Sequence, residues 1–354
     1  MQLMKQIFKK DKKLSVDKFF ERVLYDNKAG YYSKKIIFGK EGDYITSPMI
    51  SVLFGEMITI WLITIWESIG KPNKFNIVEL GPGNGELAKV IYETSRGFKE
   101  FNDSISIFLF EKSPNLRTIQ KKILKNKKVK WIKSFSNVKD GPIIFIGNEF
   151  FDSIPIKQFK KNKGKVFEKY YFLNEKNIIK YNYTAASYND IQNIKKYKCL
   201  KKSNFIEYPK IGFELLERVT KKISVNTGGI LLIDYGYIDP LNKSSIQSLL
   251  KHKKNKILKN LRKADITYLV NFKLLKEFFE NKKLKNKNIV TQGFFLKRLG
   301  IQHRANELSK KMSFKDKASL FLRLKRLIHQ QFMGELFKVN FCHNFKNDNI
   351  IGFN

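Results

Sequence analysis

The segment VELGPGNGEL, residues 78–87, marks a change from one kind of local structure to another. An apolar run that starts at Phe75 leads into it, and residues 86–98 follow with the apolar spacing of a helix. Glycine lets a backbone turn sharply and approach a ligand without a Cβ in the way. The first turn of the next helix offers unpaired N–H groups to an anionic or polar ligand. We therefore expect a strand, a tight turn and a helix, with a ligand at the turn.

The same alternation of apolar runs and helical stretches continues toward the C-terminus. A helix is predicted at residues 115–126, and strands are predicted at residues 105–113, 129–135, 141–150, 228–237, 288–296 and 336–344. Apolar runs that alternate with helices are typical of a parallel sheet covered on both faces. The predicted fold class is therefore α/β, with a mostly parallel, Rossmann-like sheet.

Additional elements surround this predicted core. A helix is expected at Leu14–Tyr25 with Ser15 as its N-cap, and antiparallel strands with Lys, Gly and Asn turns at about residues 159–185. We divide the chain into four parts: an N-terminal helical extension with the loop GDYITSP (1–70), a cofactor-binding core that contains the β insertion (71–240), an inserted helical segment (241–285), and C-terminal strands and helices that complete the core (286–354).

The charge of the chain is strongly unbalanced. Its 354 residues contain 69 Lys and Arg against 32 Asp and Glu, a formal net charge of +37. Such a charge is typical of a nucleic-acid or anionic-membrane binder. However, the lysines spread from Lys5 to Lys346 rather than gathering in one region, which favours nucleotide bias over a binding face. We therefore expect no stable binding of nucleic acid.

Cysteine usage and hydropathy limit the cellular setting. The two cysteines, Cys199 and Cys342, exclude a disulfide scaffold and a multi-cysteine metal cluster, so no metal is expected and the cytoplasm is the predicted compartment. The lysine-interrupted N-terminus does not resemble a secretory signal. Residues 49–66 are long and apolar enough to span a bilayer, but they contain Glu56, and a charge at that depth costs about 2.5 kcal/mol or more. This pattern predicts a buried helix and no membrane insertion.

Three interpretations of the glycine-rich turn differ in the ligand they imply. Its glycines stand at positions 81, 83 and 85, whereas a dinucleotide dehydrogenase needs G-x-G-x-x-G, and the Lys-Ser/Thr of a phosphate-binding P-loop is absent. The form E-x-G-x-G-x-G, which begins at Glu79, resembles the first motif of S-adenosylmethionine methyltransferases. A purely structural turn is the alternative. Glu111, at the end of the second strand, can accept both hydrogen bonds of a ribose diol, which favours a nucleoside-bearing cofactor.

Polar residues follow the predicted strand at 141–150. Asn148, Glu149 and Asp152 stand where this strand reaches the same edge of the sheet as the glycine-rich turn. Methyl transfer requires an acceptor lone pair aligned with the methyl group, together with groups that hold or deprotonate the acceptor. These three residues are the predicted catalytic groups, with helix capping as an alternative role for Asp152.

Several stretches, in this order, resemble the MidA family, which includes the mitochondrial complex I assembly-factor arginine methyltransferase. The resemblance covers nearly the whole chain and is carried by GYY (30–32), GDYITSP (42–48), FGE (54–56), VELGPGNGEL (78–87), SPNLR (113–117), NEFFDSIP (148–155), IDYG (233–236), ADIT (264–267), TQG (291–293) and MG (333–334). It implies the fold of class I methyltransferases, with S-adenosylmethionine as the methyl donor.

The resemblance also assigns roles to individual residues. The cofactor is expected at Glu79, Gly81, Gly83, Gly85 and Glu111, and beneath the loop that holds Thr46, Ser47 and Pro48, with Asp43 of that loop among the catalytic residues. Asp265 and His252 are expected near the acceptor. Around these two residues the chain departs from the family pattern, because Ser244-Ser245-Ile246 replaces Asp-Thr-Leu, and Leu269 and Asn271 replace His and Asp.

The implied activity is methylation of an arginine guanidinium on a protein, with a complex I subunit as the candidate partner. Arginine is cationic, so carboxylates are expected in its site. An RNA or small-molecule methyltransferase, or a non-catalytic respiratory assembly factor, are the alternative functions. The oligomeric state stays open, with a homodimer among the options.

Overall fold

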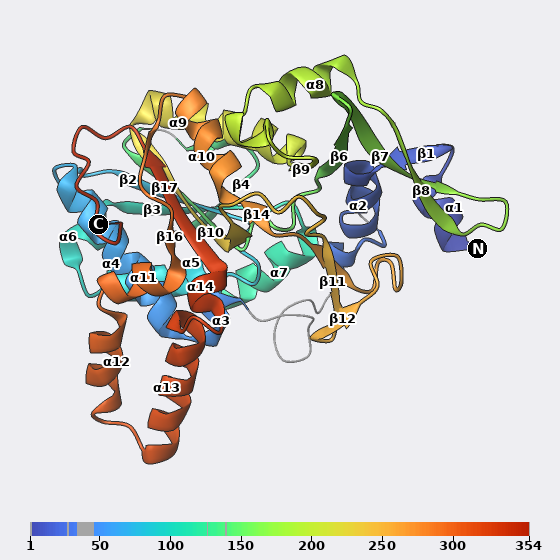
Figure 1. Ribbon diagram of the computed structural model, residues 1–354. Helices are drawn as coiled ribbons and strands as arrows, with labels where there is room; N and C mark the ends of the chain where they lie inside the picture. Colours follow the sequence, from blue (N-terminus) through green and yellow to red (C-terminus); the bar gives the residue numbers. More distant parts are fainter. Residues whose placement is uncertain (1, 27, 34–45, 126, 139, 354) are drawn as a thin grey trace.

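The computed structural model describes residues 2–26, 28–33, 46–125, 127–138 and 140–353 (Figure 1). Its centre is a sheet with the strand order β15-β17-β10-β5-β2-β3-β4, in which β14 also pairs with β10 and β16 with β17. The main parallel strands are β2 (Phe75–Leu80), β3 (Ile105–Phe110), β4 (Val129–Ile132), β5 (Ile143–Asn148) and β10 (Gly228–Tyr237). The strand β17 (Phe337–His343) runs antiparallel to β10 and pairs on its other side with the short strands β15 and β16. The predicted α/β class with a mostly parallel, Rossmann-like sheet is confirmed.

Both faces of the central strands are buried, which explains why these strands are largely apolar. In β10, Leu231 and Ile233 pack into one hydrophobic core, while Ile230 and Leu232 pack into the other. The first core is closed by α4 (Val52–Ser68), α5 (Glu86–Ser95), α6 (Lys99–Ser104) and the C-terminal helices. The second is closed by α9 (Lys210–Asn226) and α10 (Phe272–Asn281).

The N-terminal extension packs against a second, antiparallel sheet. It contains α1 (Gln2–Phe8), β1 (Lys13–Ser15), α2 (Val16–Leu24) and the 3₁₀ turn η1 (Tyr31–Ser33). The second sheet joins β1 to β6 (Lys157–Asn162), β7 (Lys165–Leu173), β8 (Ile179–Ala185) and β9 (Phe205–Tyr208), and α8 (Tyr188–Lys195) connects β8 to β9. The antiparallel strands predicted in this region are confirmed, as is the N-terminal helix. Ser15 occupies the N-cap position of α2, but its side chain makes no capping hydrogen bond to the helix backbone and its Oγ donates to Oδ1 of Asp17 instead.

The inserted segment predicted to be helical is largely a small sheet instead. β11 (Gln247–Leu250) pairs with both β12 (Lys253–Asn255) and β13 (Asp265–Thr267), and only α10 at the end of the segment is a helix. The physical reason is a tight turn at Lys251 and His252, whose φ angles of 48° and 62° reverse the chain.

The predicted strand at residues 288–296 is also wrong over most of its length. Only β16 (Val290–Thr291) is extended, and α11 (Gln292–Arg298) follows at once. The Thr291 side chain accepts a hydrogen bond from the Phe294 backbone N–H at 3.2 Å, so the local N-cap outweighs the β propensity of the apolar residues. The remaining short elements are α3 (Ser47–Ile50), η2 (Phe135–Asn137), η3 (Lys198–Leu200), β14 (Val270–Asn271), β15 (Lys285–Asn286) and α14 (Met333–Leu336).

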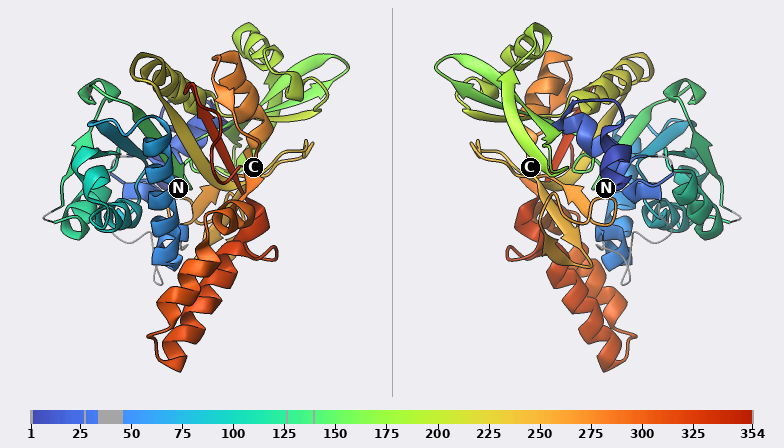
Figure 2. Two further views of the ribbon diagram at one scale, coloured as in Figure 1. Left: turned by 90° about the vertical axis from the view of Figure 1, so that its left-hand side faces the viewer. Right: turned by 90° about the vertical axis from the view of Figure 1, so that its right-hand side faces the viewer.

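Two C-terminal helices, α12 (Ile301–Ser309) and α13 (Phe314–Ile328), form a hairpin that projects from the body (Figure 2). Its base is fixed to α4, because Arg304 donates two hydrogen bonds of 2.9 Å to the carboxylate of Glu56. Glu56 is thus an ion-paired residue of a largely apolar helix that packs inside the protein. Among the described residues, no helix is long and apolar enough to cross a membrane.

Candidate functional site

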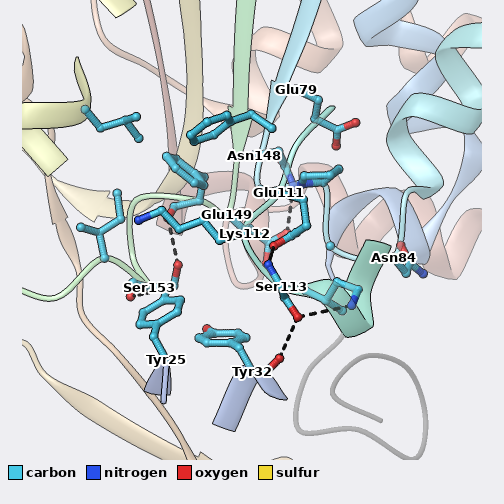
Figure 3. Close-up of a pocket in the computed structure, with 18 of the residues that line it drawn as sticks. Tyr25, Tyr32, Glu79, Asn84, Glu111, Lys112, Ser113, Asn148, Glu149 and Ser153 are labelled. Atoms are coloured by element: carbon cyan, nitrogen blue, oxygen red, sulfur yellow. Dashed lines mark hydrogen bonds between the residues drawn. The ribbon is translucent and has the colours of Figure 1, made fainter. Parts of the chain in front are cut away.

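A cavity of about 790 Å³ lies where β2, β3 and β5 end (Figure 3). The turn after β2 and the residues that follow β3 and β5 form its inner wall, and α2, η1 and α9 contribute side chains from outside the sheet. Parallel strands commonly place their ligand sites at this edge. The glycine-rich turn, Glu111 and the polar group at residues 148–149 therefore meet in one cavity, as the spacing of the motifs predicts.

The glycine-rich turn has a conformation that needs its glycines. Gly81, Gly83 and Gly85 have φ angles of 62°, 53° and 92°, which L-residues with side chains rarely adopt. A Cβ on Gly81 would lie 2.5 Å from Cδ2 of Phe150, so the backbone here reaches the cavity only because the residue has no side chain. Gly81 and Gly83 line the cavity, while Gly85 lies behind them as the N-cap of α5.

A buried glutamine connects this turn to the acidic residue after β3. Nε2 of Gln120, on α7 (Pro114–Ile123), donates to the Gly83 carbonyl oxygen at 2.8 Å and to Oε2 of Glu111 at 3.3 Å. Its Oε1 accepts from Nε1 of Trp131 at 2.8 Å. Sequence reasoning missed Gln120, although a signal existed: it lies four residues after Leu116, on the apolar face of an otherwise basic helix.

Glu111 is held in place and largely withdrawn from water. Besides Gln120, the backbone N–H of Ser113 donates to its Oε1 at 2.7 Å. Burial is the main reason that its pKa is raised above the ordinary value, and the hydrogen bonds oppose that rise. The carboxylate lines the cavity in a fixed orientation, as a ribose-binding acid requires.

Two buried side-chain oxygens in the cavity wall have no hydrogen-bond donor within the described part of the chain. They are Oε2 of Glu79 and Oδ1 of Asn148. Glu79 is 4% exposed, and this burial raises its pKa to about 8. Because an unpaired buried oxygen costs about 1–3 kcal/mol, these atoms point to a ligand that donates N–H bonds or carries positive charge.

Glu149 has the most constrained geometry in the cavity. Its φ of 48° lies in the left-handed region, and its backbone N–H donates to the Ile233 carbonyl oxygen at 2.8 Å. Oε1 accepts from the Ser47 backbone N–H at 2.8 Å and from Nδ2 of Asn148 at 3.3 Å. Burial, reinforced by the charge of Asp152, raises the pKa of Glu149 to about 8.

The residues of the predicted closing loop take different places. Thr46 and Pro48 line the cavity, whereas Ser47 is fully buried behind it. Oγ of Ser47 donates to Oε1 of Gln292 at 3.3 Å, and Nε2 of Gln292 donates to the Leu327 carbonyl oxygen at 2.9 Å. Glu149 is therefore connected through Ser47 and Gln292 to the base of the α12–α13 hairpin. The predicted catalytic residue Asp43 lies outside the described residues.

Besides Gly85 and Ser47, three further predicted site residues do not line the cavity. Asp152 lies behind it, where its carboxylate accepts a hydrogen bond from the Tyr235 hydroxyl, and burial raises its pKa to about 6. Asp265 is buried and accepts from the Tyr32 hydroxyl at 3.3 Å. His252 is exposed at the turn between β11 and β12, because that segment is a hairpin rather than a helix. These positions place Asp152 and Asp265 in supporting contacts and separate His252 from the cavity.

The N-terminal extension supplies a wall that sequence reasoning missed. Tyr25 and Tyr32 stack with their ring centroids 5.0 Å apart, and Figure 3 shows them at the end of the cavity away from Glu79. The Tyr25 hydroxyl donates to the Ser153 carbonyl oxygen at 2.9 Å, and Oγ of Ser113 donates to the Tyr32 carbonyl oxygen at 3.1 Å. The extension is thereby bonded to the ends of β3 and β5.

The cavity is acidic although the protein is basic. Its lining contains six carboxylates against two cationic side chains, a formal balance of −4 in a chain of +37: Glu21, Asp26, Glu79, Glu111, Glu149 and Glu214 against Lys112 and Arg218. Burial raises the pKa of Glu79 and of Glu149 to about 8, so their charged forms lack the compensation that water would supply. A positively charged ligand would provide it.

Comparison with known proteins identifies related sequences and folds. The model of a family described as "Putative S-adenosyl-L-methionine-dependent methyltransferase" matches residues 57–290. The mitochondrial protein arginine methyltransferase NDUFAF7 of Danio rerio is 27% identical over 92% of this chain and 82% of its own length, and that of Homo sapiens is 27% identical over 92% and 78%. A COG1565 superfamily protein from Burkholderia thailandensis, crystallised with S-adenosyl-homocysteine, has the same fold, with a TM-score of 0.81, 18% identity, and coverage of 100% of this chain and 92% of that one.

Replacing Gln120 tests the connection between the glycine-rich turn and Glu111. We expect Gln120→Met to weaken binding of S-adenosylmethionine about tenfold and to lower the free energy of unfolding by about 1–3 kcal/mol, because Trp131 and Gly83 lose buried partners. Titration calorimetry and urea unfolding measure the two effects. Thr118→Ala, on the exposed side of the same helix, is the matched control. Equal affinities of the two variants would contradict the role of Gln120.

Replacing Glu79 tests whether its buried carboxyl has a raised pKa in the folded protein. Between its ordinary pKa of 4.5 and its native pKa of about 8, the folded protein keeps a proton that the unfolded chain has released. Raising the pH through this window therefore lowers the free energy of unfolding, by a few kcal/mol, since one pKa unit corresponds to about 1.4 kcal/mol. We expect Glu79→Gln to remove this loss while weakening binding of S-adenosylmethionine. Urea unfolding curves measured at several pH values across this window test the prediction. An equal fall in the free energy of unfolding for both proteins would disprove the raised pKa of Glu79.

Proposed function

Because the chain belongs to the MidA family of S-adenosyl-L-methionine-dependent methyltransferases, we propose that it methylates an arginine side chain of a protein, with a complex I subunit as the candidate substrate. S-adenosylmethionine is its cofactor. The observation that carries the proposal is the acidic cavity of a basic protein, because both the sulfonium donor and a guanidinium acceptor are cations. The names of the relatives, arginine methyltransferases, support the same acceptor.

The residues around the cavity fit the cofactor. Gly81 and Gly83 line the cavity with backbone alone, and the carboxylate of Glu111 would accept the ribose hydroxyls. The unpartnered Oε2 of Glu79 would accept a hydrogen bond from the amino group of the methionine part. When bound, the cofactor supplies a methyl group on a positively charged sulfur.

Asn148 and Glu149 are the proposed groups for the acceptor. The unpartnered Oδ1 of Asn148 would accept from a guanidinium N–H, and the carboxylate of Glu149 would hold a second N–H and orient the attacking nitrogen. As the new N–C bond forms and the S–C bond breaks, the acceptor nitrogen must lose a proton. Glu149 would receive it, and its pKa of about 8 suits a general base near neutral pH.

Asp152, Asp265 and the N-terminal tyrosines would act indirectly. Asp152 lies beside Glu149 and raises its pKa, and Asp265 holds the hydroxyl of Tyr32. The relatives are named as mitochondrial proteins, whereas the cytoplasm stays the prediction for this chain.

The proposal is tested by incubating the protein with methyl-labelled S-adenosylmethionine and purified complex I subunits. Mass spectrometry of digested subunits should find arginine with one or two added methyl groups. Label in RNA or a small molecule, with every arginine unmodified, would overturn the proposal.

Glu149→Gln tests the proposed base. We expect methyl transfer to slow about 10²- to 10⁴-fold, while binding of S-adenosylmethionine changes little, because the lost group acts on the acceptor. The rate of the unaltered enzyme should rise with pH until Glu149, with its pKa of about 8 in the free protein, is ionised. The variant should lose this dependence.

Glu111→Gln is the matched control, since it should weaken binding of the cofactor instead. A Glu149→Gln enzyme with an unaltered rate would show that another group takes the proton.

A further inference from the structure

The projecting α12–α13 hairpin has one side packed inside and one side exposed. Leu320, Leu324 and Leu327 of α13 are buried in the first hydrophobic core. On the opposite side Phe314 is 89% exposed and Leu322 is 68% exposed. With 100° per residue, Phe314, Ala318 and Leu322 form one continuous stripe along the outer face of α13.

Exposed apolar side chains concentrate in this part of the molecule. Five of the twelve large apolar residues that are exposed in the described chain lie between residues 294 and 336, on or beside helices α11 to α14: Phe294, Phe314, Leu322, Phe332 and Leu336. Single exposed apolar residues need no explanation, but a stripe on a projecting element indicates a contact surface.

The stripe is flanked by positive charge. Residues 301–328 contain eight Lys and Arg against Glu307 and Asp316, a net charge of +6. Among the described residues six of these cations form no ion pair with an acidic side chain: Lys311, Lys315, Lys317, Arg323, Lys325 and Arg326. A helix with an apolar stripe between lysines is typical of segments that lie at the surface of an anionic membrane.

We propose that the α12–α13 hairpin docks the protein peripherally on an anionic lipid bilayer, with Phe314 and Leu322 among the headgroups. Charge favours lipid over a second copy of this chain as the partner of the hairpin. A second copy of a chain of +37 would bring like charges together, whereas anionic lipid attracts them. The hairpin projects from the body (Figures 1 and 2), and its most exposed apolar residue, Phe314, is the first residue of α13, beside the turn that joins the two helices. A projecting element of this kind can enter a deformable surface.

This proposal is independent of the chemistry in the cavity. The two are nevertheless connected in space, because the Leu327 carbonyl oxygen at the hairpin base accepts from Gln292, which also contacts Ser47 behind the cavity wall. A docked hairpin would therefore hold the cavity in a defined orientation above the bilayer.

The full chain should be sedimented with vesicles of phosphatidylcholine alone and with vesicles that also contain phosphatidylglycerol. We expect binding at least about tenfold tighter to the anionic vesicles, and a loss of about tenfold or more in the double variant Phe314→Ser/Leu322→Ser. Val225→Ser, which removes a residue 78% exposed at the end of α9, is the matched control and should bind as the unaltered protein does.

A second measurement reports insertion directly. The emission of Phe314→Trp should shift to shorter wavelength with the anionic vesicles and stay unchanged with neutral ones. Unaltered binding of S-adenosylmethionine verifies that each variant is folded.

Equal vesicle binding by the double variant and the control would overturn the proposal, because the overall charge of the protein would then account for all of the binding. Two other results would also overturn it: a Phe314-dependent dimer, or Phe314-dependent binding of RNA or an acidic protein in the absence of vesicle binding.

Discussion

The site depends on one buried amide. Gln120 donates to both the Gly83 carbonyl oxygen and the Glu111 carboxylate, so the turn after β2 and the acid after β3 are held at a fixed separation. Neither backbone pairing nor packing alone would do this, because both groups lie beyond the last paired residues of their strands. The indole N–H of Trp131 fixes the amide in turn. A ligand that needs both the turn and the acid therefore meets a preorganised surface, which lowers the entropy lost on binding.

The acidity of the cavity has an energetic cost that ligands can recover. Burial raises the pKa of Glu79 and of Glu149 to about 8, so the empty cavity favours their protonated forms near neutral pH. A cationic ligand reverses that preference by supplying the missing counter-charge. Discrimination then follows, since a neutral or anionic compound of similar shape would leave the same carboxylates uncompensated. Because the chain as a whole has a net charge of +37, the acidity of the cavity comes from the particular residues that line it and not from the overall composition.

Some strands could be predicted as well as the glycine-rich turn, because they depend only on the residues of one short segment. The strand at 228–237 is a continuous apolar run, and it matches β10 residue for residue. Predictions failed where the structure depends on contacts with other residues of the chain. The segment around His252 forms strands because β11 pairs with β13, a contact that sequence spacing does not reveal. Residues 292–296 are helical although apolar, because Thr291 caps them. Asp152 follows a strand as Glu149 does, but it bonds to Tyr235 and not toward the cavity.

The order of apolar runs and helices determined the parallel sheet, and the glycines at 81, 83 and 85 indicated the edge at which the cavity lies. Both could be predicted because periodicity and backbone freedom are properties of short segments. Only the tertiary structure decided which carboxylates share the cavity. It also showed that Gln120 holds Glu111 and that the Ser47 backbone holds Glu149. The closure of one end by Tyr25 and Tyr32 likewise appeared only in the folded chain. These contacts join residues from separate elements, and their hydrogen bonds and pKa values depend on burial, which no short segment possesses by itself.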